Sequence, residues 1–158
     1  MKNNGILIVD DERAARFGMK KALSKDGYML YEAKDGTEAL ESVISHKPRL
    51  VFLDINMPGI DGLKVLEKIK EIEFPPLVVI ITAYGSEKIA VEAMKKGAFD
   101  YVAKPFEIDE LRIIVKNAFE KLALEEENAQ LRSEINRLEA MGEIIGQSVI
   151  MKDVFNRM

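Results

Sequence analysis

Short apolar stretches alternate with longer amphipathic ones along the first two thirds of the chain. One apolar stretch runs from Leu50 to Leu53, so that four apolar residues precede the single carboxylate of Asp54. Runs of this length are typical of strands buried on both faces, as in a parallel sheet. The same pattern predicts five strands, at residues 5–9, 28–33, 49–54, 77–81 and 99–103. The second is the most polar, which places it at a sheet edge.

Helical patterns fill the intervals between these strands, with apolar residues three or four positions apart and Gly or Pro at the ends. They run between Glu12 and Gly27, between Asp35 and Pro48, from Gly62 to Ile72, between Ser86 and Gly97, and from Glu107 to Met141. Strands that alternate with helices indicate right-handed crossovers. We therefore expect an α/β fold: a five-stranded parallel sheet in the flavodoxin-like order 2-1-3-4-5, helices on both faces and an extended C-terminal helix.

Composition narrows the function classes. The 158 residues include no Cys, which excludes a disulfide framework and a thiolate metal site. The single histidine, His46, excludes a multi-histidine metal site and argues against a Ser-His-Asp triad. The net charge of −4 gives no global basic field for nucleic acid. No apolar run approaches membrane-spanning length and no signal-peptide core is evident, so we expect a cytoplasmic protein.

Chemically reactive residues follow the predicted strands. Asp10 and Asp11 come after the first strand, Asp54 ends the third, Thr82 follows the fourth and Lys104 follows the fifth. In the order 2-1-3-4-5, the first and third strands are neighbours at the switch point of the sheet, where ligands bind. Each residue alone has an ordinary explanation as a helix cap, a turn former or a solvated cation. Their conjunction at one sheet edge predicts a single site.

Three convergent carboxylates repel one another, and a divalent cation relieves that repulsion. Carboxylate oxygens, a backbone carbonyl and waters are the ligand set that Mg²⁺ favours. With Mg²⁺ bound, one carboxylate could attack a phosphorus atom. A hydroxyl from Thr82 and an ammonium from Lys104 could then bind a phosphoryl group on Asp54.

Four motifs resemble the receiver domain of two-component response regulators, and the resemblance covers residues 5–120. They are Val9-Asp10-Asp11-Glu12, the segment from Asp54 to Gly62, Ile81-Thr82-Ala83 and Lys104-Pro105-Phe106. The resemblance implies that Asp54 accepts a phosphoryl group from a phosphohistidine of a sensor kinase. It also implies that Asp11 and Asp54 bind Mg²⁺ directly with the backbone carbonyl of Asn56, whereas Asp10 acts largely through water.

The same resemblance implies how the site changes state. Lys104 would bind the phosphoryl group next to a cis peptide bond to Pro105. Thr82 would move towards the phosphoryl oxygen, and Tyr101 would follow inward as a second switch residue. A receiver of this kind is not an enzyme in the usual sense, since it catalyses only its own phosphoryl transfer and dephosphorylation.

The long last helix carries two apolar registers. One stripe, Leu111, Val115, Ala118 and Leu122, should pack on the sheet. The other alternates four- and three-residue spacings as in a coiled coil, and consists of Leu124, Asn128, Leu131, Ile135 and Leu138. We therefore expect a receiver domain at residues 1–121 and a coiled-coil dimerisation linker at 122–141. The alternative is a solvated single helix with incidental leucines.

Residues 142–158 resemble the opening of the AAA+ ATPase domain of NtrC-type transcriptional activators. The resemblance implies a regulatory fragment of a longer transcriptional activator, in which the homodimer expected from the linker would control the protein's own AAA+ domain. We expect this fragment itself to contact neither nucleic acid nor a membrane. No Walker A sequence is present, so this stretch is not an ATPase by that route.

Two other functions compete with this interpretation. A haloacid-dehalogenase-like phosphohydrolase also uses a nucleophilic Asp with Mg²⁺, but it normally needs a second Asp two residues later, where this chain has Asn56. An inert coiled-coil interaction module with a decayed site is the other, and the complete set of acidic, hydroxyl and ammonium residues argues against it.

Overall fold

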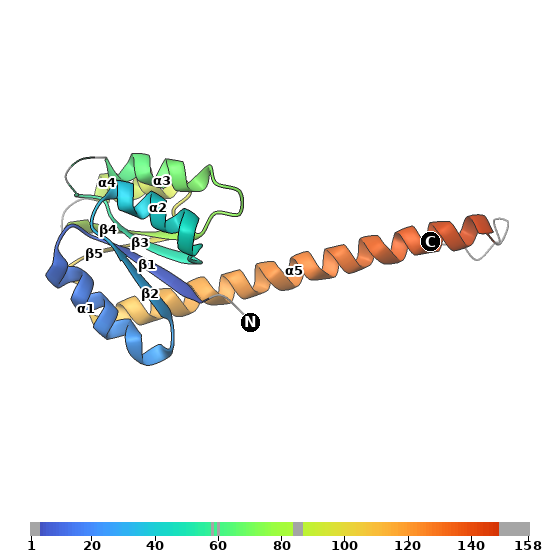
Figure 1. Ribbon diagram of the computed structural model, residues 1–158, viewed down its shortest axis with the longest axis horizontal. Coiled ribbons are helices and arrows are strands. Elements are labelled where there is room, and N and C mark those ends of the chain that lie inside the picture. The colour runs from blue at the N-terminus through green and yellow to red at the C-terminus, as the bar shows by residue number, and fades with distance from the viewer. Residues whose placement is uncertain (1–3, 58, 60, 84–86, 149–158) are drawn as a thin grey trace. The chain divides into compact units, whose positions relative to one another are not determined.

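The computed structural model describes residues 4–57, 59, 61–83 and 87–148. Its centre is a five-stranded parallel sheet in the order β2-β1-β3-β4-β5 (Figure 1). The strands are β1 (Gly5–Val9), β2 (Met29–Ala33), β3 (Leu50–Asp54), β4 (Leu77–Ala83) and β5 (Asp100–Lys104). The predicted fold class and strand order are confirmed, and the polar second strand lies at an edge, where it pairs with β1.

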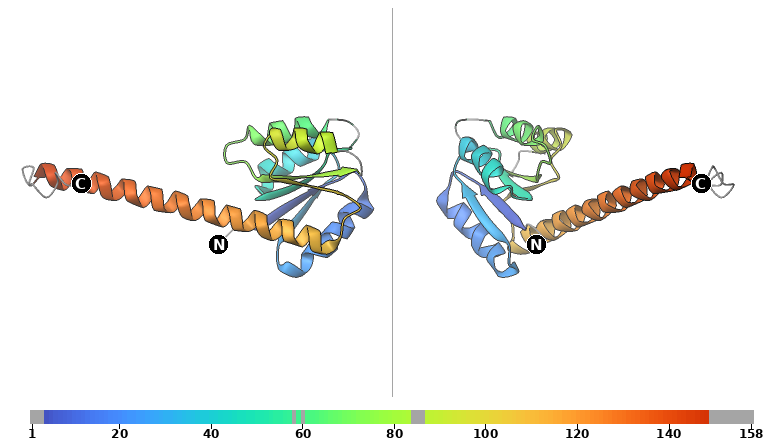
Figure 2. Two further views of the ribbon diagram at one scale, coloured as in Figure 1. Left: turned by 180° about the vertical axis from the view of Figure 1, so that it is seen from behind. Right: turned by 45° about the vertical axis from the view of Figure 1, so that its right-hand side comes forward.

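Helices cover both faces of the sheet. They are α1 (Arg13–Leu23), α2 (Gly36–His46), α3 (Gly62–Lys70), α4 (Glu87–Lys95) and α5 (Ile108–Ser148), with a short 3₁₀ helix η1 (Ser24–Asp26) after α1. In Figures 1 and 2, α2, α3 and α4 lie on one face, and α1 and residues 108–118 of α5 lie on the other.

The central strands have no polar face because helices bury both sides. Successive side chains of a strand point to opposite faces. One set forms a hydrophobic cluster with α2 and α3, and includes Leu7, Val9, Val51, Leu53, Val78, Ile80, Val65, Leu66 and Ile69. The other set, with Ile6, Ile8 and Phe52, is also fully buried. Burial of each such side chain contributes roughly 1.5–3 kcal/mol, so these strands anchor the loops that follow them.

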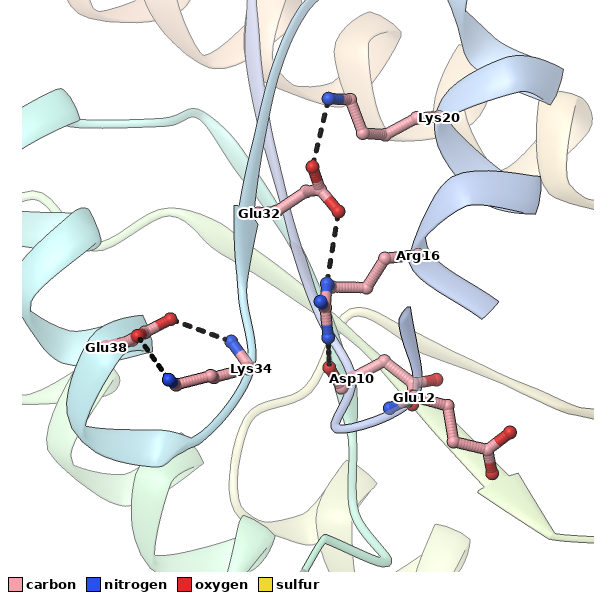
Figure 3. A network of polar contacts seen from close by, with 7 residues as sticks. All are labelled: Asp10, Glu12, Arg16, Lys20, Glu32, Lys34 and Glu38. Carbon is pink, nitrogen blue, oxygen red and sulfur yellow. Dashed lines mark hydrogen bonds and ion pairs between the residues drawn. The ribbon is translucent and has the colours of Figure 1, made fainter. Parts of the chain in front are cut away.

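Local signals define several helix ends. Gly27, with φ of 80°, reverses the chain after α1 and η1, in the role that the sequence predicts for it. Asp35 caps α2 by accepting from the Glu38 amide at 2.8 Å. The Glu38 side chain in turn accepts from the Lys34 amide at 3.0 Å (Figure 3). Ser86, the predicted cap of α4, lies outside the described residues.

Helix α5 is longer than expected. The sequence predicts an end at Met141, whereas the helix continues through Gly142 and Gly146 to Ser148. A helical Gly costs about 1 kcal/mol relative to Ala, which weakens a helix without ending it.

The chain divides into two compact units, Met1–Ala118 and Phe119–Met158, so the sheet belongs entirely to the first. Residues 149–158, part of the predicted AAA+ opening, lie outside the described residues.

Gly62 is required by the close approach of two segments next to the sheet edge. A Cβ at Gly62 would lie 2.6 Å from the Cα of Ile55, the residue after Asp54. We therefore expect Gly62→Ala to destabilise the protein by about 1–3 kcal/mol in urea unfolding, as overpacking does. The matched control is Gly18→Ala in α1, where nothing lies within 4 Å. It should instead stabilise the protein by about 0.5–1 kcal/mol. Equal effects of the two substitutions would contradict the steric argument.

Candidate functional site

Three carboxylates meet at the carboxyl edge of the sheet. Asp10 directly follows β1, Asp11 is the next residue, and Asp54 is the last residue of β3. Because β1 and β3 are hydrogen-bonded neighbours, their ends lie side by side. One carboxylate oxygen from each residue lies within 4.8 Å of the others. Asp10 and Asp54 are buried, whereas Asp11 is exposed to solvent.

Lys104 reaches this cluster from the end of β5. Its Nζ donates to Oδ2 of Asp10 at 2.8 Å and to Oδ2 of Asp54 at 3.2 Å. The peptide bond from Lys104 to Pro105 is cis, as the resemblance implies. One ammonium therefore bridges the two buried carboxylates, which come from different strands.

Backbone amides hold the remaining oxygens of the buried carboxylates. The amide of Glu12 donates to Oδ1 of Asp10 at 2.9 Å, and the amide of Asn56 donates to Oδ1 of Asp54 at 2.9 Å. Each buried carboxylate thus has one oxygen on an amide and one on the ammonium. Within the described residues, no buried side-chain nitrogen or oxygen lacks a hydrogen-bond partner. The orientation of both carboxylates is therefore fixed before any ligand arrives.

Burial and charge oppose each other at Asp54. Burial raises the pKa of its carboxyl, the hydrogen bond from Asn56 and the charge of Lys104 act to lower it, and the charge of Asp10 adds to the rise. Burial would lower the pKa of Lys104, but its contacts with Asp10 and Asp54 outweigh that effect and raise it. Lys104 therefore stays cationic at neutral pH. Three carboxylates face one ammonium, so negative charge is in excess.

Thr82 and Tyr101 lie on the strands that follow. Thr82 is buried near the end of β4, in register with Ala103 and therefore beside the strand that ends in Lys104. Tyr101 is the second residue of β5, and 43% of its surface is exposed. Thr82 thus shares the sheet edge with the carboxylates, whereas Tyr101 lies in an outward position.

Sequence reasoning missed a side chain that contacts the acidic loop. Arg16 of α1 donates from Nη1 to the backbone oxygen of Asp10 at 2.6 Å and also binds Glu32 of β2 (Figure 3). No spacing along the sequence predicts this contact, because it joins a helical side chain to a main-chain oxygen in a preceding loop.

The donor set suits a hard cation. Carboxylate oxygens gathered from three residues are ligands that Mg²⁺ prefers, and the carbonyl of Asn56 follows Asp54 closely in the chain. The one imidazole, His46, stacks on Tyr31 at the end of α2, with 4.2 Å between ring centroids. The residues at the sheet edge thus fit Mg²⁺ and not a metal that prefers nitrogen or sulfur ligands.

A family profile described as the response regulator receiver domain matches residues 6–116. The chain belongs to this receiver family. Receiver domains are regulatory, and the family match favours this function over the phosphohydrolase alternative. Within the described residues, no helix combines the length and apolarity needed to cross a membrane.

Curated relatives differ in how much of their own length this chain covers. Sporulation initiation phosphotransferase F of Bacillus subtilis is 41% identical over 116 residues, which cover 73% of this chain and 94% of that protein. Regulatory protein AtoC of Escherichia coli strain K12 is 37% identical over 151 residues, covering 96% of this chain and 33% of the relative. The DNA-binding transcriptional regulator NtrC of the same strain is 36% identical over 158 residues, covering 98% and 32%. The chain thus spans about a third of the length of AtoC and NtrC.

Solved structures agree with the fold. The crystal structure of NtrX from Brucella abortus matches with a TM-score of 0.77 and 38% identity over 80% of this chain and 29% of that one. The receiver domain of NtrX alone matches with a TM-score of 0.70 and 39% identity, over 73% of this chain and 98% of that one. The receiver resemblance, including the NtrC-type class, is therefore confirmed.

The raised pKa of Asp54 predicts that the difference in stability between Asp54→Asn and the parent protein depends on pH. Because burial raises the pKa of Asp54 in the folded protein, the folded state binds this proton more tightly than the unfolded state does. The resulting stability is fully present below the unfolded pKa of about 3.9 and is lost as the pH rises through the folded pKa. Asp54→Asn should therefore unfold at a higher urea concentration than the parent at pH 7 in EDTA, and the gain should shrink at pH 3. A lower midpoint for the variant at pH 7 would contradict this account.

Proposed function

We propose that Asp54 is the phosphoacceptor of this receiver domain and takes its phosphoryl group from a phosphohistidine of a sensor histidine kinase. The observation that supports this most is the bridge from Lys104 to Asp10 and Asp54 beside a third carboxylate. The carboxylates after β1 and at the end of β3 and the ammonium at the end of β5 lie at one edge of the sheet, as a nucleophile, its metal ligands and a phosphate-binding cation would need to.

In the proposed reaction, a carboxylate oxygen of Asp54 forms a bond to the phosphorus atom as the bond from phosphorus to the histidine nitrogen breaks. The leaving imidazole keeps the electron pair and takes a proton from solvent. Lys104, which binds the carboxylate before the reaction, would then pair with a phosphoryl oxygen. The hydroxyl of Thr82 would donate to another phosphoryl oxygen.

Mg²⁺ would be held by Asp11, Asp54 and the backbone carbonyl of Asn56, with Asp10 acting largely through water. When bound, it would neutralise the excess negative charge of the carboxylates and of the incoming phosphoryl group. Asp10 keeps Lys104 in place through the 2.8 Å contact, so the ammonium stays at the site when Asp54 is modified. We infer that the protein catalyses only its own phosphoryl transfer and dephosphorylation.

The switch and the output follow from the same site. Thr82 would move towards the phosphoryl group, and Tyr101, which is exposed in this structure, would turn inward. The relatives AtoC and NtrC are about three times as long as this chain; by name, AtoC is a regulatory protein and NtrC a DNA-binding transcriptional regulator. We therefore propose that the chain is the regulatory part of a longer cytoplasmic activator whose AAA+ domain begins within residues 142–158.

The linker proposal is supported by an apolar stripe that the single chain leaves exposed. Leu124, Leu131, Ile135 and Leu138 of α5 are all more than half exposed. Asn128, at the position between them, is exposed as well. We propose that residues 122–141 pair with a second copy of the chain as a coiled coil, in which Asn128 would favour one register.

The acceptor proposal is tested by labelling with acetyl phosphate and Mg²⁺. The parent protein should gain the mass of one phosphoryl group by intact-mass spectrometry, and Asp54→Ala should gain none because the nucleophile is absent. The matched control is Asp109→Asn, which removes an exposed carboxylate at the start of α5 and should be labelled normally. Normal labelling of Asp54→Ala would refute the assignment.

The linker proposal is tested by light scattering. Leu131→Asp places a charge in the apolar stripe and should convert the dimer to a monomer, since two charges would face each other across the seam. Ser133→Asp is the control, because it introduces the same charge two residues later at an exposed position off the stripe. The control should keep the parent mass. If the mass of Leu131→Asp also stays that of the parent, the stripe does not form the dimer.

A further inference from the structure

A polar network joins the loop that carries Asp10 to helix α1 and to the edge strand β2 (Figure 3). Arg16 donates from Nη1 to the backbone oxygen of Asp10 at 2.6 Å and from Nε to Oε1 of Glu32 at 3.1 Å. The Arg16 side chain is only 14% exposed. One planar guanidinium, mostly withdrawn from solvent, therefore ties the end of β1 to the neighbouring strand.

Glu32 is itself held from a second side. Its Oε2 accepts from Nζ of Lys20 at 3.0 Å. The hydrogen bond from Lys20 lowers the pKa of Glu32; burial opposes this, and Arg16 adds to the lowering, so Glu32 is an anion at neutral pH. Glu32 also pairs in register with Ile8 of β1, two residues before Asp10. The carboxylate that holds Arg16 is thus fixed to the same strand that leads into the site.

Every polar group of Asp10 has a partner in this structure. Its amide donates to the backbone oxygen of Ala33 at 3.1 Å, and its side chain is held by the Glu12 amide and by Lys104. Its backbone carbonyl is held by Arg16. Because a peptide unit is planar, the carbonyl of Asp10 and the amide of Asp11 move as one body. The contact with Arg16 therefore fixes the peptide that joins the two acidic residues.

We propose that Arg16 is a positioning residue for the acidic pair. Its contact with the Asp10 carbonyl sets the orientation of the peptide between Asp10 and Asp11, and Glu32 sets the orientation of Arg16. The inference rests on the proposed function, since it concerns how well this pair holds Mg²⁺. Partners that orient metal ligands without touching the metal typically change its affinity by about 10–100-fold when removed.

Charge and geometry make opposite predictions for Arg16. If the positive charge of Arg16 mattered most, removing it would make the net charge around the carboxylates more negative and would strengthen Mg²⁺ binding. If its geometric role dominates, removing it frees the peptide between Asp10 and Asp11 and weakens binding. The sign of the change therefore separates the two explanations.

The experiment titrates the full chain with Mg²⁺ and measures the dissociation constant for Mg²⁺ by calorimetry. The proteins compared are the parent, Arg16→Met and Glu32→Gln. Met keeps an unbranched apolar stem and removes both donors. The matched control is Arg112→Met, which removes another arginine ion pair, formed with Asp26 at 2.9 and 3.1 Å. A second measurement in EDTA records amide exchange at Glu12, whose N–H is bound by the Asp10 side chain.

We expect Arg16→Met to weaken Mg²⁺ binding by about tenfold and Glu32→Gln to weaken it less, with Arg112→Met unchanged. Exchange at Glu12 should become faster in Arg16→Met and not in Arg112→Met. Unchanged or tighter Mg²⁺ binding in Arg16→Met would overturn the inference while leaving the acceptor role of Asp54 intact. Equal acceleration at Glu12 in both arginine variants would show a general loss of stability and would also overturn it. Failure of the parent to bind Mg²⁺ would instead refute the proposed function on which the inference rests.

Discussion

The structure depends on an excess of negative charge that is held at one edge of an otherwise apolar sheet. Asp10 and Asp54 are buried there beside Asp11, and the ammonium of Lys104 bridges the first two. A buried carboxylate without such partners would be strongly destabilising, so the hydrogen bonds from the amides and from Lys104 offset much of the cost of burying Asp10 and Asp54. The remaining imbalance is what makes the site receptive to a divalent cation.

The fold explains why these groups can be held so closely. Parallel strands buried on both faces end at a common edge, and the apolar side chains of β1, β3 and β4 fix where each strand stops. Gly62 then lets the next helix approach Ile55 without a side chain between them. Asp54 and Lys104 are the last residues of β3 and β5, so their positions follow from the packing of the sheet.

Much of this could be predicted from the sequence because the signals are local. Apolar runs identify the strands, and the carboxyl end of each run identifies Asp54, Thr82 and Lys104. The sequence pattern underestimates the length of helix α5, because Gly142 suggests a helix end although a glycine only weakens a helix. The contact between Arg16 and the Asp10 carbonyl could not be predicted, since it depends on how α1 lies against the sheet and involves a main-chain atom that every residue has.

The central claim is that Asp54 carries the phosphoryl group as a mixed anhydride. Borohydride reduces an aspartyl phosphate to homoserine and leaves phosphate esters and free carboxylates unchanged. The most direct measurement is therefore to reduce the phosphorylated protein with borohydride and to map the peptides by mass spectrometry. The account predicts homoserine at position 54 alone, and homoserine at another aspartate, or none in a protein that has gained the phosphoryl mass, would contradict it.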